Sequence, residues 1–403
     1  MRGRQFHGLL FALQSLPKHG GVKNVEAASG DQASIMARIE TTILPTKPSA
    51  HSPQAPLNKS LDDIVRIPSY RDINDLVQGE KIIGNVEHLL DFVIAGFAKT
   101  GTTTLTKSYF NKHPEISIPL SEIHFLTNHE PVKMVHLLHS LQKPASSTTT
   151  TTKRGYKSPR DIADPKVLNM FAKFWPRAKL IVGVRHPIEW FESFYNYRLR
   201  GNYSMPPAEL LDGECMQDMT SIEKRHITFA IKYNGLNDRG VCADLARYHV
   251  RLSLMGKTNV TDPAENVLLG PRRQKLAAWA PIPNEVFLYE VKQLSDSNMT
   301  RQKVFFHDIS HYLGLTTPFR FQRRKFTPHY TKDLFDICDS KYTQLRQKLL
   351  QIGQNASKWI INFFMEHPEV TVSSPEHFRL LLERWNLDPC LAKIEKTLSV
   401  SSL

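Results

Sequence analysis

The chain has 403 residues, 41% of them hydrophobic, which suffices for one large α/β domain with appended segments and excludes disorder of the whole chain. The formal net charge is +13, from 52 Lys and Arg against 39 Asp and Glu. This balance favours anionic partners: nucleotides, nucleic acids, acidic glycans or anionic membrane surfaces. Because the basic residues are scattered and no known nucleic-acid-binding module is present, we expect no nucleic-acid partner.

The N-terminal segment has no sustained periodicity. Residues 1–60 are rich in Ser, Ala, Pro and Gly, as in a flexible leader or stem, and we extend this variable part to 1–88. The apolar stretch Phe6–Leu13 is too weak for a secretory signal, and no run of about 18 apolar residues predicts a membrane-spanning helix. Membrane association by other means stays open. We therefore expect a folded domain at 89–392 and a tail at 393–403.

Past residue 88, compact apolar runs alternate with segments of helical spacing. The apolar runs predict buried strands at 91–95, 179–184 and 286–289. Helical spacing is found at 102–111, at 166–174, at 187–198, before Gly314 and over 332–388. The alternation predicts a three-layer α/β/α fold with a central parallel sheet, similar to P-loop NTPases, plus a helical C-terminal part at 331–392. A Ser/Thr tract at 146–152 predicts an exposed loop.

The segment Gly96–Leu105, with the sequence G-F-A-K-T-G-T-T-T-L, joins the first predicted strand to the first predicted helix. In such a turn, successive backbone N–H groups and the helix N-terminus point into one concavity that favours a phosphate. Gly96 and Gly101 allow the backbone to turn tightly and to approach a ligand. The segment predicts a phosphate-binding loop; the alternative is a structural turn with an exposed lysine.

The same loop argues against a nucleoside triphosphatase. Gly96 and Gly101 have the spacing of the G-x-x-x-x-G-K-[ST] motif, but Thr102 stands where that motif has its lysine. The lysine of this loop is Lys99, three residues earlier. Without a lysine on the β- and γ-phosphates, kinase or NTPase activity is disfavoured, and it stays as an alternative function.

A second phosphate-type segment follows the strand predicted at 179–184. Arg185 ends that strand, and Ser193 lies within the next helix. An arginine at the carboxyl end of a parallel strand can donate two hydrogen bonds to a phosphate, at the edge where open α/β sheets bind ligands. Ser193, one and a half to two turns into the helix, can face the same pocket.

Together these segments resemble the 5′-phosphosulfate loop and the 3′-phosphate segment of sulfotransferases that use 3′-phosphoadenylyl sulfate (PAPS). Three further segments resemble Golgi carbohydrate sulfotransferases, especially the heparan sulfate group: P-L-S-E-I-H-F-L at 119–126, Y-K-S-P at 156–159 and R-R-K at 323–325. The resemblance covers about residues 89–330. Two positions depart from the family pattern, because Ser121 replaces a lysine that contacts the acceptor and Trp190 replaces an auxiliary basic residue.

The resemblance implies a role for each matching residue. Lys99 would hold the bridging oxygen and the leaving phosphate, and Glu122 would be the general base, with His124 as the alternative. Lys157 would face the acceptor. The residues implied in donor binding are Lys99, Thr100, Gly101, Thr102, Thr103, Thr104, Arg185, Ser193, Arg324 and Lys325. PAPS is then the co-substrate, and no metal is required.

The acceptor and the compartment are less constrained. We expect a hydroxyl or amine of a glycan in the Golgi; the alternatives are a cytoplasmic enzyme and a catalytically silent member that binds nucleotide or glycan. Cys338 and Cys390 should form a disulfide if the protein matures in an oxidising compartment. Five N-x-S/T sequons also favour a lumenal protein, at Asn58, Asn202, Asn259, Asn298 and Asn355.

Overall fold

A computed structural model describes residues 72–141, 152–201, 205–213, 241–258, 262–270, 281–320 and 335–391. Its centre is a six-stranded sheet of order β4-β5-β3-β6-β7-β8, in which each neighbouring pair is parallel. The strands of this sheet are β3 (Phe92–Gly96), β4 (Ile116–Ser117), β5 (Lys153–Lys157), β6 (Lys179–Val184), β7 (Val286–Glu290) and β8 (Val370–Val372).

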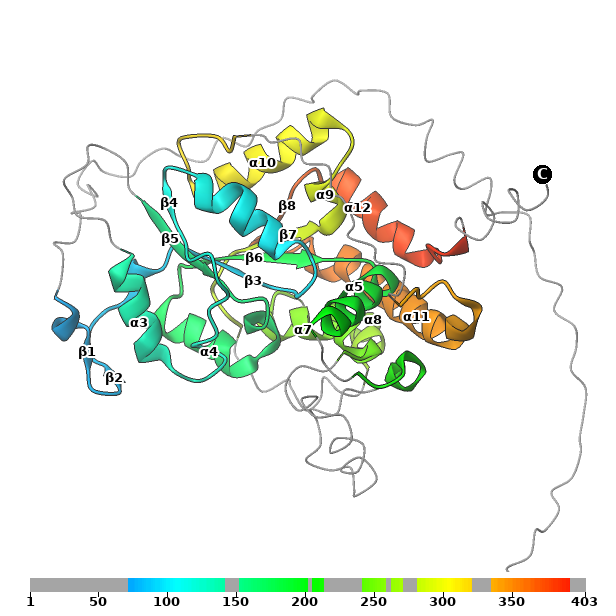
Figure 1. The fold of residues 1–403 in the computed structure, drawn as a ribbon. Coiled ribbons are helices and arrows are strands. Elements are labelled where there is room, and N and C mark those ends of the chain that lie inside the picture. The colour runs from blue at the N-terminus through cyan, green and yellow to red at the C-terminus, as the bar shows by residue number, and fades with distance from the viewer. Residues whose placement is uncertain are drawn as a thin grey trace, which may run out of the picture. The chain divides into compact units, whose positions relative to one another are not determined.

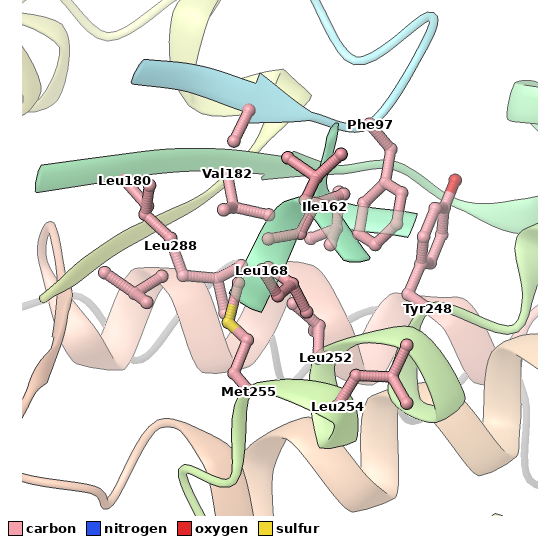
Figure 2. Close-up of a cluster of buried hydrophobic side chains, with 14 of the residues drawn as sticks. Phe97, Ile162, Leu168, Leu180, Val182, Tyr248, Leu252, Leu254, Met255 and Leu288 are labelled. Atoms are coloured by element: carbon pink, nitrogen blue, oxygen red, sulfur yellow. The ribbon is translucent and has the colours of Figure 1, made fainter. Parts of the chain in front are cut away.

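Side chains along the strands alternate between the two faces of the sheet, as pleated strands require. In β6, Leu180, Val182 and Val184 belong to one hydrophobic core, whereas Ile181 belongs to a second core on the opposite face. Figure 2 shows part of the first core, where Leu180, Val182 and Leu288 point from the sheet toward the helical segments beneath it. Both faces of the strands are buried, which explains their nearly continuous apolar sequences.

Helices cover both faces (Figure 1). Those that contribute to the first core include α4, α5, α7 and α11, and those that contribute to the second include α10 and the π-helical turn η3 (Leu105–Tyr109). The α-helices are α2 (Thr102–Thr104), α3 (Pro131–Ser140), α4 (Pro165–Phe174), α5 (Pro187–Arg200), α7 (Tyr248–Leu252), α8 (Pro263–Leu269), α9 (Val291–Leu294), α10 (Met299–Leu313), α11 (Thr343–Trp359) and α12 (Pro375–Glu383).

This architecture confirms the predicted three-layer class with a central parallel sheet. Strand β6 has the predicted bounds, β3 is shifted by one residue at both ends, and β7 is longer than predicted by one residue at its C-terminal end. The helix predicted at 102–111 is helical throughout, as α2, η3 and the 3₁₀ turn η4 (Phe110–Lys112). The C-terminal part is helical as predicted, and it also supplies the edge strand β8.

The segment just before the first predicted strand also folds. A short antiparallel pair, β1 (Val77–Gln78) with β2 (Lys81–Ile82), follows the 3₁₀ turn η1 (Ile73–Asp75), and η2 (Glu87–Leu89) leads into β3. Leu76, Val86 and Leu89 are buried in the first core. Apolar contacts with the sheet domain therefore begin well before residue 89.

A disulfide joins Cys338, ahead of α11, to Cys390, after α12, with 5.2 Å between the two Cα atoms. The expected pairing is present. Cross-links that close loops of this size typically stabilise a fold by about 2–4 kcal/mol, largely by restricting the unfolded chain. The Arg346 side chain supports the same junction, because it pairs with Asp388 at 3.2 Å and donates to the Ile337 carbonyl at 2.9 Å.

The tract at 146–151, the basic segment at 323–325 and the sequons at Asn58, Asn202 and Asn259 lie outside the described residues. Within the part of the chain that the structure describes, no helix is both long and apolar enough to cross a bilayer.

Candidate active site

The residues singled out in the sequence meet at the carboxyl edge of the sheet. Chain segments leave β3, β5, β6 and β7 there, carrying Lys99, Lys157, Arg185 and Lys292, respectively. Parallel strands place all their carboxyl ends at one edge, and open α/β folds bind ligands at this edge. Four cationic side chains thus lie beside four neighbouring strands, where an anionic ligand would gain most from them.

The loop after β3 adopts the conformation that a close phosphate contact needs. Lys99 and Gly101 both have a left-handed backbone, with φ of 65° and 88°, and α2 begins at the next residue, Thr102. A Cβ added at Gly101 would lie 2.5 Å from Leu294 Cδ1, so a side chain there would displace Leu294 and would also strain the left-handed backbone. Turns of this kind, opening a helix, aim backbone N–H groups at an anion.

Three hydrogen bonds hold this loop. Thr100 Oγ1 donates to the Phe97 carbonyl at 2.6 Å, and the Tyr289 hydroxyl of β7 donates to the Thr100 carbonyl at 3.0 Å. Trp190 Nε1 of α5 donates to the Ala98 carbonyl at 2.9 Å. Trp190 therefore anchors the loop to α5.

Lys99 extends from the loop toward α5. Its ammonium lies 4.4 Å from the centre of the Tyr197 ring. Burial and, to a smaller extent, repulsion from the Arg185 and Arg200 guanidinium groups together lower the pKa of Lys99 to about 8, against a smaller opposing effect of Glu122. A bound anion would relieve this repulsion, so the loop is electrostatically prepared for a negatively charged ligand.

Glu122 lies on the other side of the loop, joined to it through a buried lysine. Lys157 Nζ, at the end of β5, is 3.2 Å from Glu122 Oε1 and donates to Thr103 Oγ1 at 3.2 Å. His124 Nε2 is 3.7 Å from the other carboxylate oxygen. The Lys157 side chain is 3% exposed and that of Glu122 is 43% exposed, so the lysine fixes a carboxylate that a substrate can still reach.

Arg185 follows β6 and touches the loop from a third side. Its Nη1 donates to the Lys99 carbonyl at 3.4 Å, and its Nε lies 3.8 Å from Glu189 Oε2. The other oxygen of Glu189 is 2.9 Å from Lys292 Nζ. Ser193 is half-buried on α5, one helical turn past Glu189, and residues four apart share a helix face.

The structure thus brings Lys99, Glu122, His124, Lys157 and Arg185 to one edge, with Ser193 on the adjoining helix face. Arg324 and Lys325 lie outside the described residues. Sequence reasoning missed Tyr197 and Lys292. For Tyr197 the available signal was its i+4 spacing from Ser193, and for Lys292 its position just after the strand predicted at 286–289.

No protein-family model matches the chain, and no curated protein matches it in sequence. Among solved structures, the chain is similar to the crystal structure of a sulfotransferase from Alicyclobacillus acidocaldarius. Sequence identity is 15% and the TM-score 0.40, over 67% of this chain and 95% of that chain. At this distance the similarity assigns neither a reaction nor a substrate, so the function has to be argued from the site.

Proposed function

We propose that the protein is a sulfotransferase that moves the sulfuryl group of PAPS to an acceptor hydroxyl or amine. The observation that carries this proposal is the pairing of Lys99, inside a phosphate-type loop, with Glu122, held across the loop by Lys157 and Thr103. Sulfuryl transfer needs a cation at the leaving phosphate and a base at the acceptor, both aligned with the sulfur. These two groups stand on either side of one loop.

On the donor side, the loop residues 100–104 receive the 5′-phosphosulfate, and Lys99 neutralises the charge that grows on the leaving phosphate oxygen. Arg185 and Ser193 take the 3′-phosphate. Lys292 adds a second cation beside Arg185, on the same Glu189 carboxylate. We assign to Lys292 the auxiliary contact that Trp190 does not supply.

On the acceptor side, Glu122 accepts the hydroxyl proton as the acceptor oxygen forms its bond to sulfur. The bond from sulfur to the bridging oxygen breaks, and its electron pair stays on the phosphate beside Lys99. Lys157 orients the Glu122 carboxylate before the transfer. Ser121 cannot supply the charge of the lysine found there in related enzymes, so Lys157 is the acceptor-side cation near this base.

Kinase or NTPase activity is the alternative reaction. Thr102 in place of the phosphate-binding lysine disfavours it. A silent binding protein would have no need of a carboxylate fixed by a buried lysine beside the loop, whereas an enzyme does. We take a glycan of the Golgi lumen as the acceptor class on the resemblance of segments 119–126 and 156–159 to carbohydrate sulfotransferases.

Donor binding is tested by thermal stabilisation. Adenosine 3′,5′-bisphosphate should raise the melting temperature of the protein, and ATP with Mg²⁺ should raise it little. Arg185→Ala should weaken binding of the bisphosphate by at least tenfold, because charge-assisted hydrogen bonds are lost. Arg177→Ala is the matched control, since the Arg177 side chain is 79% exposed and pairs with Glu87. Stabilisation by ATP–Mg²⁺ alone would favour the kinase alternative.

Lys99→Ala should lower turnover of labelled PAPS by about 100-fold or more, since the leaving phosphate loses its cation. Lys107→Ala, an exposed lysine of η3, is the control and should keep normal turnover. In the wild type, affinity for the bisphosphate should fall as pH rises through about 8, because Lys99 loses its proton there. This fall should be absent in Lys99→Ala. More than a tenth of normal turnover in Lys99→Ala would refute the assigned role.

Glu122→Gln separates the chemical step from donor binding. The amide keeps the shape but cannot accept a proton, so kcat should drop about 10²–10⁴-fold while affinity for adenosine 3′,5′-bisphosphate stays unchanged. Glu130→Gln serves as the control, because Glu130 pairs with Lys133, three residues away at the start of α3. Normal kcat in Glu122→Gln together with a large loss in His124→Gln would move the base role to His124.

The lumenal location rests on the disulfide and the sequons. Asn298 is exposed at the start of α10, whereas Asn355 is half-buried in α11 and the Ser357 of its sequon is 2% exposed. When the protein is directed into the secretory pathway, Asn298 should carry a glycan that endoglycosidase removes. Asn298→Gln should reduce the endoglycosidase-sensitive mobility shift by the size of one glycan, and Asn355→Gln should leave it unchanged. An unmodified Asn298 would contradict the location.

A further inference from the structure

Tyr197 is a large aromatic side chain that the fold leaves 51% exposed. It lies near the end of α5, and the face of its ring is occupied by the Lys99 ammonium at 4.4 Å from the ring centre. The face of an aromatic ring carries partial negative charge and attracts a cation at this distance. The ring therefore contacts the Lys99 ammonium, which neutralises the leaving phosphate in the proposed reaction.

The charged groups around Lys99 give the contact between its ammonium and the Tyr197 ring an electrostatic role. Arg185, just after β6, and Arg198 and Arg200, on α5, all repel its ammonium, and Glu122, from the segment between β4 and α3, attracts it. Repulsion from three guanidinium groups would favour conformers in which the lysine turns away from the loop or gives up its proton. Burial acts in the same direction. The Tyr197 ring is an attractive surface on the α5 side.

Residues in and just before α5 contact both ends of the Lys99 residue. Arg185, two residues before the helix, donates to the Lys99 carbonyl, and the Tyr197 ring contacts the Lys99 ammonium. Within α5, Glu189, Ser193 and Tyr197 follow one another at intervals of four residues, so neighbouring members of this series share a helix face. The backbone of Lys99 lies in the left-handed region, with φ of 65°, and this conformation sets the direction in which its Cα–Cβ bond leaves the loop.

We propose that Tyr197 is a positioning residue for Lys99, whose ring holds the ammonium charged and at the mouth of the loop until the donor takes it over. The inference deepens the proposed sulfotransferase function and rests on it for its meaning, although the contact itself exists without a donor. The ring, not the hydroxyl, makes the contact. Tyr197→Phe is consequently a matched control for Tyr197→Leu.

The first measurement needs no substrate. The rate at which an amine-reactive acylating reagent labels Lys99 follows its neutral fraction, and peptide mass spectrometry over pH 6–10 gives the apparent pKa. Loss of the ring should raise the labelling rate at pH 7 about three- to tenfold in Tyr197→Leu, the range expected for one cation–π contact. Tyr197→Phe should label like the wild type. Both variants should melt normally, because the side chain is half exposed.

The second measurement is turnover. Tyr197→Leu should lower kcat by about three- to tenfold and leave the KM of the acceptor unchanged. Tyr197→Phe, which keeps the ring, should have the wild-type kcat. Unchanged labelling of Lys99 in Tyr197→Leu overturns the proposal. A raised acceptor KM with unchanged labelling would instead make the ring part of the acceptor site. If Tyr197→Leu changes the labelling of Lys99 but the wild-type protein does not turn over PAPS, the Tyr197 contact is supported and the sulfotransferase function is refuted.

Discussion

The hydrogen bond from the Tyr289 hydroxyl to the Thr100 carbonyl ties the phosphate-type loop to the sheet, and much of the site depends on it. It exists because Gly183 of β6 leaves room for it. A Cβ at Gly183 would lie 2.4 Å from Tyr289 Cζ and 2.7 Å from Thr100 Oγ1. Because Gly183 in β6 has no side chain, the Tyr289 side chain of the neighbouring strand β7 can extend across β6 and hydrogen-bond to the loop. With the loop fixed, Lys99 and Arg185 keep their relative positions, and the charges around them act on one small volume.

The sequence predicted the parts of the fold that follow from continuous apolar runs. Strands β3, β6 and β7 are buried on both faces, so their apolar residues mark them clearly. Strands β4, β5 and β8 escaped prediction for physical reasons. β5 has the sequence K-R-G-Y-K and gains its place by pairing with β3, while β4 and β8 are short strands at the two edges. Edge strands need little apolar surface, and tertiary pairing overrides their weak local preference.

The candidate site likewise contains residues that the sequence could predict and contacts that it could not. Lys99 and Arg185 could be predicted because each stands next to a recognisable strand end. The contact between Glu122 and Lys157 could not, because it depends on β5 lying beside β3 after a long crossover. The roles of Trp190 and Lys292 also depend on the fold: the Trp190 indole anchors the loop through the Ala98 carbonyl, and Lys292 brings a cation to the Arg185 side of the site from another strand end.

The disulfide between Cys338 and Cys390 encloses α11, β8 and α12 in one covalent loop. β8 is the last strand of the sheet and covers the side of β7 that would otherwise carry unpaired backbone groups. An exposed strand edge is a template for pairing with other chains. A chain made under reducing conditions would hold this cover by non-covalent contacts alone, and each transient opening would offer β7 to a neighbour. The cross-link therefore limits how far β8 can leave β7, and it does so only when the protein is prepared in an oxidising environment.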